Sequence, residues 1–266
     1  MKKLSKLYLV LVLLFLYVPI FVLIVFSFNE TKSRSVFSGF TLDWYAKLFH
    51  NRIIISSLVN TLIIASIASV ASTILGTFAA IGINSMRKVP KAFVMNTTNM
   101  PIINPEIVTG VSLMLLFVFF ALRMNLEFGF VTLLIAHITF DVPYVILNIM
   151  PKFKQMDPHL YEAAQDLGCS PFQAFRKVVL PEIMPGVVSG FLMAFTYSLD
   201  DFVISYFTSG STSQTLPITI YSMTRRKISP EINALSTLIF AAVVAILIVK
   251  NIIENRAARR ASGKEA

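Results

Sequence analysis

The sequence predicts an all-α polytopic membrane protein with six transmembrane helices, and three observations support this. Of the 266 residues, 56% are hydrophobic and only 14% are charged, whereas soluble domains have about 25% charged residues. The apolar residues form runs of about 20 residues without Lys or Arg, the length needed to cross roughly 30 Å of hydrocarbon. The basic residues lie between these runs, as membrane topology signals do. The bilayer is therefore the main solvent of this chain.

The six predicted spans differ in regularity. They are Leu7–Phe28, Ser57–Asn84, Ala92–Leu122, Phe130–Met150, Pro185–Phe207 and Ile232–Ile253. The first is interpreted as a retained helix, because its apolar stretch of 22 residues exceeds a signal core and no small-residue cleavage site follows it. Pro101 and Pro105 interrupt the third, which must be either a shorter helix or a broken one. A break at membrane depth requires protein or a wet cavity to satisfy the freed backbone groups.

The distribution of Lys and Arg predicts the orientation. The larger share of the 23 basic residues falls on the side of both termini, which are therefore expected in the cytoplasm. The cluster Arg225–Lys227 on the other side opposes this trend without reversing it. Residues 1–254 are expected to form one transmembrane domain, which includes a cytoplasmic loop at 151–184, and residues 255–266 a polar tail.

Charge and motif content exclude several classes of protein. The net charge of +9 is spread between the apolar runs, so no nucleic-acid partner is expected. The G-x-x-x-x-G-K-[ST] motif is absent, so the chain should not bind or hydrolyse ATP itself. Of three His residues only His137 lies in a predicted span, and Cys169 is the one cysteine. We therefore expect no catalytic residue, no metal and no cofactor in this chain.

The loop between the fourth and fifth spans reads as two short helices. Asp157 is a good N-cap for the first helix, and Gly168 suits the left-handed position after its end. Ser170 and Gln173 form a capping box for the second helix, which should stop before Pro181. The result is a helix–glycine–helix elbow on the cytoplasmic side.

The residues of this elbow match a known pattern. In order they are Glu162-Ala163-Ala164, three residues, Gly168, nine residues and Val178-Val179-Leu180-Pro181. This resembles the signature loop of permease subunits of binding-protein-dependent bacterial ABC importers, which has Glu-Ala-Ala, three residues, Gly, nine residues, Ile, one residue and Leu-Pro. Val178 stands where Ile is usual, a change that keeps an aliphatic contact.

The resemblance covers nearly the whole chain. Further stretches look like the second permease subunit of spermidine/putrescine ABC importers: Tyr17–Ile20, Phe26–Asn29, Leu42–Leu48, Pro105–Gly110 and Ser198–Phe202. The Ser-Leu-Asp-Asp-Phe run is the most telling of these. The resemblance implies a type I ABC importer permease fold and ATP-driven import of polyamines by alternating access.

The resemblance also implies how the chain is powered. The elbow between helices 4 and 5 would be a cytoplasmic coupling helix that docks in a groove of an ATPase subunit. The residues implied in coupling are Glu162, Ala163, Ala164, Gly168, Leu180 and Pro181. The alanines permit close approach, Gly168 permits the reversal, and Glu162 offers a carboxylate to the partner. The alternative role of Glu162 is that of a surface residue paired one helical turn away.

The partners implied are a second permease, two copies of an ATP-binding subunit and an external, periplasmic substrate-binding protein. The assembly would lie in the bacterial inner membrane. ATP and Mg would be bound by the ATP-binding subunits, and their closure would open the permeases outward to receive substrate.

Acidic residues inside the spans point to what is carried. The ionisable residues there are Glu106, His137, Asp141, Asp200 and Asp201, with no Lys or Arg in the interior of any predicted span. A charge at the bilayer centre costs about 2.5–3.5 kcal/mol. The acids therefore need a partner, which could be a cationic substrate, a basic residue of another subunit, or protons.

Helical spacing suggests a path for a polyamine. His137, Asp141 and Tyr144 share one helix face, as do Tyr197 and Asp201 in the fifth span together with Ser205. Ammonium groups would meet carboxylates, and aromatic faces could cover the methylenes. The candidate path residues are Trp44, Glu106, Asp141, Tyr144, Tyr197, Ser198, Asp200 and Asp201.

Each candidate has another interpretation. Asp141 could form a hydrogen-bonded pair with His137, and one of Asp200 and Asp201 could cap a helix break or face another subunit. Of these two we favour Asp201 for the path. Trp44 could be an interfacial anchor or a stacking surface for substrate at the outer mouth.

Two rival functions remain. An ABC importer permease for a different solute, such as an anion or a sugar, would have the same elbow. A cation-coupled secondary transporter would not need the elbow, and such proteins commonly have paired internal repeats, which this sequence lacks.

Overall fold

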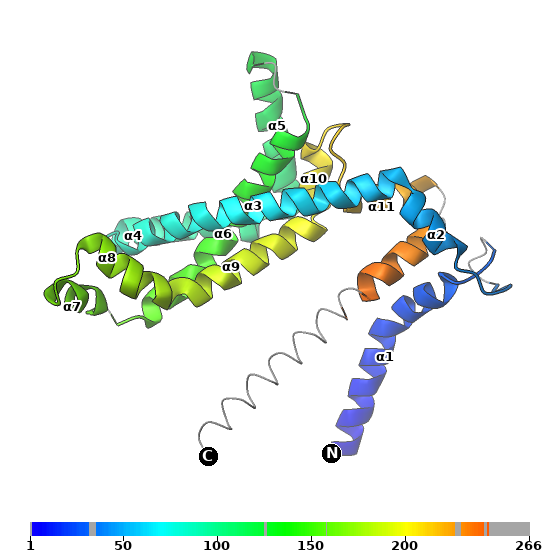
Figure 1. Ribbon diagram of the computed structural model, residues 1–266, viewed down its shortest axis with the longest axis horizontal. Coiled ribbons are helices and arrows are strands. Elements are labelled where there is room, and N and C mark those ends of the chain that lie inside the picture. Colours follow the sequence, from blue (N-terminus) through cyan, green and yellow to red (C-terminus); the bar gives the residue numbers. More distant parts are fainter. Residues whose placement is uncertain are drawn as a thin grey trace. The chain divides into compact units, whose positions relative to one another are not determined.

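The computed structural model describes residues 2–31, 36–124, 127–157, 159–226, 230–241 and 244. These residues are helical or irregular, apart from one isolated β-bridge between Asn29 and Phe40. The α-helices, labelled in Figure 1, are α1 Lys2–Phe26, α2 Asp43–His50, α3 Arg52–Asn84, α4 Lys88–Ile103, α5 Glu106–Met124, α6 Phe130–Gln155, α7 Leu160–Asp166, α8 Pro171–Ala174, α9 Leu180–Asp200, α10 Val203–Thr208 and α11 Leu216–Arg226. A π-helical turn, η1 Phe175–Val179, joins α8 to α9. Residues 230–241 are helical as well. The predicted all-α class is confirmed.

Five helices of the described residues are long and apolar enough to cross a membrane. They are Lys6–Phe26, Arg52–Asn84, Glu106–Arg123, Phe130–Gln155 and Pro171–Asp200. The sixth predicted span, Ile232–Ile253, lies largely outside the described residues, and its described part, 232–241 and 244, is helical. The chain is therefore a polytopic helical membrane protein, and the count of six spans stays a prediction.

The chain divides into two compact units. The first is formed by Met1–Ile55 and Ile220–Ala266, and the second by Ser56–Thr219. In the first unit, α1 is apolar and exposed along nearly its whole described length. Beyond α1 the chain folds back on itself, because Asn29 and Ser27 bond to the segment around α2.

In the second unit, α6 packs along α9 with their backbones in close contact. The buried residues of α9 recur almost every fourth position, and four of the five are small: Ile183, Gly186, Gly190, Ala194 and Ser198. A Cβ atom at Gly186 would lie 2.9 Å from the carbonyl oxygen of Asn148. One at Gly190 would lie 3.1 Å from Val145 Cα. The two glycines, four residues apart, thus form a small-residue interface of the kind that membrane helices use to approach closely.

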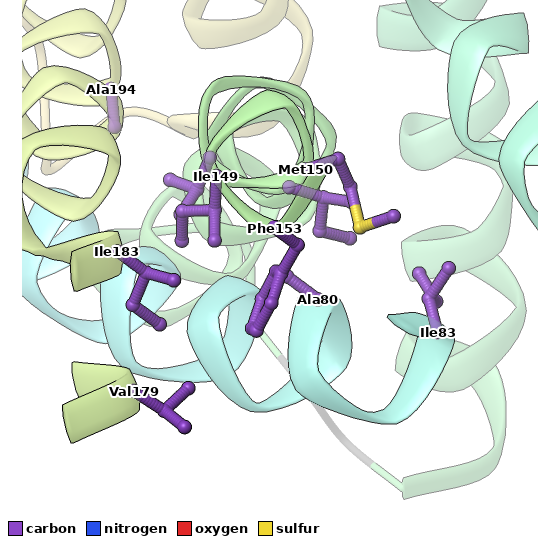
Figure 2. Packing of buried hydrophobic residues seen from close by; sticks show 10 residues of the cluster. Ala80, Ile83, Ile149, Met150, Phe153, Val179, Ile183 and Ala194 are labelled. Carbon is purple, nitrogen blue, oxygen red and sulfur yellow. The ribbon is translucent and has the colours of Figure 1, made fainter. Parts of the chain in front are cut away.

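The main hydrophobic cluster fills the space beside this contact. Figure 2 shows its labelled side chains gathered between three helices: Ala80 and Ile83 come from α3, Ile149, Met150 and Phe153 from α6, and Val179, Ile183 and Ala194 from η1 and α9. Val145 lies at the centre of the three helices, because a Cβ atom at Gly76 of α3 would meet its Cβ at 2.7 Å. The cluster therefore holds α3, α6 and α9 as one packed body.

We expect Gly186→Ala to destabilise the protein. The added methyl group would meet main-chain atoms of α6, so α9 must shift, and such overpacking costs about 1–3 kcal/mol. The midpoint temperature of unfolding of the purified protein should fall. Gly82→Ala is the matched control, because no atom lies within 4 Å of its Cβ position. A midpoint that is equal in the two variants would contradict the close packing.

The predicted third span, Ala92–Leu122, is two helices and not one. Helix α4 runs through Pro101 and ends at Ile103, and α5 begins at Glu106. Pro105 cannot donate a backbone hydrogen bond, and the residue before a proline is biased away from the helical region. Of the two interpretations offered by the sequence, the broken helix is confirmed.

The predicted stop before Pro181 is wrong. Helical structure continues from Pro171 through η1 into α9, and the N–H group of Leu180 bonds to Phe175 O, five residues back. A π turn of this kind inserts one extra residue into the helical ladder. It accommodates the missing N–H group of Pro181 without ending the helix.

The predicted fifth span, Pro185–Phe207, is also interrupted. Helix α9 ends at Asp200, residues 201 and 202 are not helical, and α10 begins at Val203. Helix α10 packs against α5, where a Cβ atom at Gly110 would lie 3.0 Å from Phe207 Cδ2. The breaks inside the third and fifth predicted spans both lie next to acidic residues, Glu106 at the first and Asp200 and Asp201 at the second.

Candidate functional site

The predicted elbow is present between α6 and α9. Gly168 follows α7 with φ +86°, a conformation that favours glycine. Gln173 N donates to Ser170 Oγ at 3.3 Å, and Ser170 N donates to Gln173 Oε1 at 3.1 Å, so the predicted capping box is confirmed. The prediction of Asp157 as the N-cap is wrong, because α7 begins at Leu160 with His159 at the N-cap position, and Asp157 Oδ1 instead accepts a hydrogen bond from His159 N at 2.9 Å. These local bonds fix the reversal of the chain.

The elbow presents a mixed surface to its surroundings. Glu162 is largely exposed, and its Oε2 lies 3.6 Å from His159 Nδ1. Leu167 and Phe172 are 87% and 71% exposed and so offer apolar surface on the elbow. A shallow hollow is lined by Phe172, Gln173, Arg176 and Lys177.

The remaining residues of the predicted coupling set differ in their exposure to solvent. Ala163 and Pro181 are exposed, whereas Ala164 is buried. Leu180 is partly buried against the hydrophobic cluster of α3, α6 and α9. The set therefore combines an outward surface with residues that anchor the elbow to the helices.

A buried polar network joins α6 to the break between α9 and α10. The ring of His137 is 1% exposed and bonds to two serines, with Nδ1 3.0 Å from Ser198 Oγ and Nε2 3.0 Å from Ser205 Oγ. Ser198 Oγ donates to Asp141 Oδ2 at 2.8 Å. His137 Nε2 also lies 3.6 Å from Asp201 Oδ2. The pairing of His137 and Asp141 that the sequence suggested is therefore indirect, because Ser198 lies between them.

Asp201 caps α10. Its Oδ1 accepts a hydrogen bond from Ile204 N at 3.2 Å, and its Oδ2 accepts one from Ser205 N at 2.7 Å. The residue is only 9% exposed. The structure thus gives Asp201 the capping role that the sequence left as an alternative, while its neighbour Asp200 is exposed.

Asp141 is fully buried. Among the described residues its Oδ1 atom has no hydrogen-bond partner, although Oδ2 accepts from Ser198. A buried polar atom without a partner is costly. This carboxyl group therefore faces the interior of the packed helices and is not on an open surface in this conformation.

A cluster of aromatic rings lies beside the network. The ring centroids of Tyr144 and Tyr197 are 4.4 Å apart, and Phe140 lies 5.2 Å from Tyr144. Both tyrosines are half-buried. Glu106, which is exposed, lies within electrostatic reach of Tyr144. Asp200 is three residues from Tyr197 and so shares its helix face. The accessible part of the predicted path is therefore Glu106, Asp200 and the two tyrosines.

Trp44 belongs to the first unit. It is 6% exposed, and its Nε1 atom donates to Asn29 O at 2.7 Å. Lys47 Nζ lies 4.5 Å from the ring centroid. The indole is thus held by its own unit in this conformation.

Sequence reasoning missed two features of the site. One is the double contact of His137, which spacing could not reveal because the helix break at 201–202 changes which residues face it. The other is the contact of α6 with α9, for which Gly186 and Gly190 carry a readable signal, since glycines four residues apart in an apolar helix mark close helix packing.

The fold and the elbow together define a class of protein, the membrane-spanning permease subunit of an ABC importer. Residues 72–262 match the model of the family described as binding-protein-dependent transport system inner membrane component. The chain belongs to this family, as its resemblance to such permeases suggested.

Several relatives are similar over most of their length. The chain is 36% identical over 239 residues to the spermidine/putrescine transport system permease protein PotC of Haemophilus influenzae, covering 90% of this chain and 91% of that protein. It is 39% identical over 233 residues to the putrescine transport system permease protein PotI of Escherichia coli, covering 86% and 83%. For PotC of Escherichia coli the identity is 35% over 236 residues, covering 89% and 88%.

Solved structures support the fold. A bacterial ABC transporter involved in the import of the acidic polysaccharide alginate matches with a TM-score of 0.69 at 14% identity, covering 96% of this chain and 95% of that chain. An amino acid ABC transporter with histidines matches with a TM-score of 0.54 at 21% identity, covering 81% and 99%. At these identities the likeness concerns the fold alone.

Proposed function

We propose that this chain forms, with a second permease, the path by which an ATP-driven importer carries polyamines such as spermidine and putrescine. The observation that carries the proposal is that exposed carboxylates lie near a pair of aromatic rings: Glu106 is within electrostatic reach of the half-buried Tyr144, and Asp200 lies one turn after Tyr197 in α9. A polyamine presents ammonium groups separated by methylenes, which suit carboxylates and aromatic faces respectively. The names of the three relatives point to the same substrates.

Both accessible acids lie at helix breaks. Asp200 is the last residue of α9, where the free carbonyl groups carry a partial negative charge that favours a cation. Glu106 is the first residue of α5. Transporters commonly place substrate groups at the ends of broken helices, because the free backbone groups there can bind ligands. Asp141 and Asp201, by contrast, hold the framework around this place.

The elbow is the proposed contact with a separate ATP-binding subunit. Its exposed Leu167 and Phe172 offer apolar surface, and Glu162, Arg176 and Lys177 offer charges around it. A pair of such subunits would bind ATP and Mg, and a periplasmic binding protein would deliver substrate at the outer face. The elbow and both termini would then lie in the cytoplasm.

The proposal is tested by uptake into proteoliposomes. These would hold the chain with the products of its neighbouring genes, and radiolabelled spermidine with its binding protein would be supplied outside the vesicles. We expect uptake that requires ATP inside and is inhibited by unlabelled putrescine. Uptake driven by an ion gradient without ATP would favour a secondary transporter. If no polyamine is transported but another solute stimulates ATP hydrolysis, the importer stands and the substrate is different.

A further inference from the structure

His137 joins the two sides of the break between α9 and α10. Its Nδ1 atom contacts Ser198, two residues before the end of α9, and its Nε2 atom contacts Ser205 in the first turn of α10. The ring comes from a third helix, α6, and is 1% exposed. One imidazole thus ties three helical segments together.

The hydrogen bonds that link Ser205, His137, Ser198 and Asp141 can all be assigned a donor and an acceptor. Ser198 Oγ donates its proton to Asp141 Oδ2, so its oxygen is free to accept from His137 Nδ1–H. In the neutral ring Nε2 is then an acceptor, and the Ser205 hydroxyl can donate to it. The neutral imidazole with its proton on Nδ1 therefore satisfies both serines at once. A purely accepting side chain could not do so, because Ser198 has already donated its proton to Asp141.

The backbone alone does not set the angle between α9 and α10. Asp201 is extended, with φ −61° and ψ 122°, and Phe202 has φ −105° and ψ −43°. The carboxylate of Asp201 bonds to amides of α10 only three and four residues away. Contacts from outside the break, those of His137 among them, add to these local bonds in holding α10 relative to α9.

We propose that His137 is a positioning residue, which fixes α10 against α9 and so holds Asp200 at the substrate path. This inference rests on the proposed function where it is tested by the uptake of spermidine. The fold has other supports for α10, since Thr132 Oγ1 donates to Thr208 O at 2.8 Å and Gly110 of α5 packs against Phe207. Loss of the imidazole should thus loosen the angle at the break without releasing the helix.

Three substitutions separate the two contacts of the ring. His137→Phe keeps a ring and removes both hydrogen bonds. His137→Asn places an amide near the Nδ1 position and can keep the bond to Ser198, whereas His137→Gln reaches the Nε2 position and can keep the bond to Ser205. Thr139→Val is the control on the same helix, because its exposed hydroxyl bonds only to Ile135 O of its own helix.

The first measurement is the concentration dependence of spermidine uptake by the assembled complex. We expect His137→Phe to raise KM by about fivefold or more with a smaller change in maximal rate. The KM of His137→Asn and of His137→Gln, which each keep one of the two bonds, should lie between those of His137→Phe and the wild type. Thr139→Val should match the wild type. Ser205→Ala added to His137→Phe should change KM no further, because the two residues act through one contact. An unchanged KM in assembled His137→Phe, or fully additive effects, would overturn the proposal.

The second measurement does not depend on the substrate. Spin labels on Leu192→Cys and Tyr206→Cys would report the distance between α9 and α10 in the assembled complex. Both positions are exposed, and Cys169, the one native cysteine, would first be changed to Ser. The distance distribution should broaden in His137→Phe and stay narrow in Thr139→Val.

The two measurements fail in different ways. If no polyamine is transported by the wild type, the proposed function fails, and the distance distribution still decides the role of His137. An unchanged distribution would overturn that role. So would failure of all three His137 variants to assemble, because the residue would then act in folding alone.

Discussion

Replacement of Asp200 by asparagine should raise the KM for spermidine uptake by roughly 10- to 100-fold, the loss expected for a hydrogen bond to a charged group. The carboxylate is exposed and lies at the C-terminal end of α9, where the helix dipole adds to its attraction for an ammonium group. The amide has the same shape and no charge, so packing is preserved. Initial rates of ATP-driven uptake over a range of spermidine concentrations measure the change.

Asp201→Asn is the matched control, one residue away. The residue is 9% exposed, and its carboxylate accepts two backbone hydrogen bonds of α10. We expect this variant to lower the thermal stability of the complex and to raise the KM of assembled complexes much less than Asp200→Asn does. The opposite pattern, with KM raised by Asp201→Asn and unaffected by Asp200→Asn, would return the substrate contact to Asp201.

Replacement of Glu162 by arginine should abolish most substrate uptake while the chain still folds. Glu162 is 74% exposed on α7 and makes one long contact, to His159, so its reversal disturbs no packed structure. The elbow already carries Arg176 and Lys177, and an additional positive charge would oppose a partner that is adapted to a carboxylate. We expect at least about tenfold lower uptake, as truncation of a paired interface charge typically gives. ATP hydrolysis should no longer respond to substrate.

A charge reversal at Glu182 is the appropriate comparison. Glu182 is exposed in the first turn of α9 and lies outside the matched pattern of the elbow. Uptake and ATP hydrolysis should stay coupled in Glu182→Arg. Normal uptake by Glu162→Arg would refute its role in coupling, and equal losses in both variants would indicate a general effect of surface charge.

The features that the sequence predicts well are those set by local chemistry. The capping box of Ser170 and Gln173 and the left-handed Gly168 are fixed by residues within one or two turns, and both are present. The long apolar runs likewise require helices, since a bilayer leaves backbone groups no other partner.

The features that it predicts poorly depend on how helices are interrupted. Pro105 and Pro181 both predict the end of a helix. Helical structure stops before Pro105, whereas at Pro181 it continues through a π turn. Asp201 looks like a path residue in a continuous helix and becomes a cap once the helix ends at Asp200. Only tertiary contacts decide between these outcomes.

Helix α9 transmits any movement of the elbow to its far end at Asp200. Its 21 residues span about 32 Å at about 1.5 Å per residue. A tilt of about 10° at the elbow would therefore displace the Asp200 end by about 5 Å, given that helical rise. Because Gly186 and Gly190 hold α9 tightly against α6, both helices would move together. The change of angle would then occur at the break after Asp200, beside the carboxylate proposed to meet the substrate.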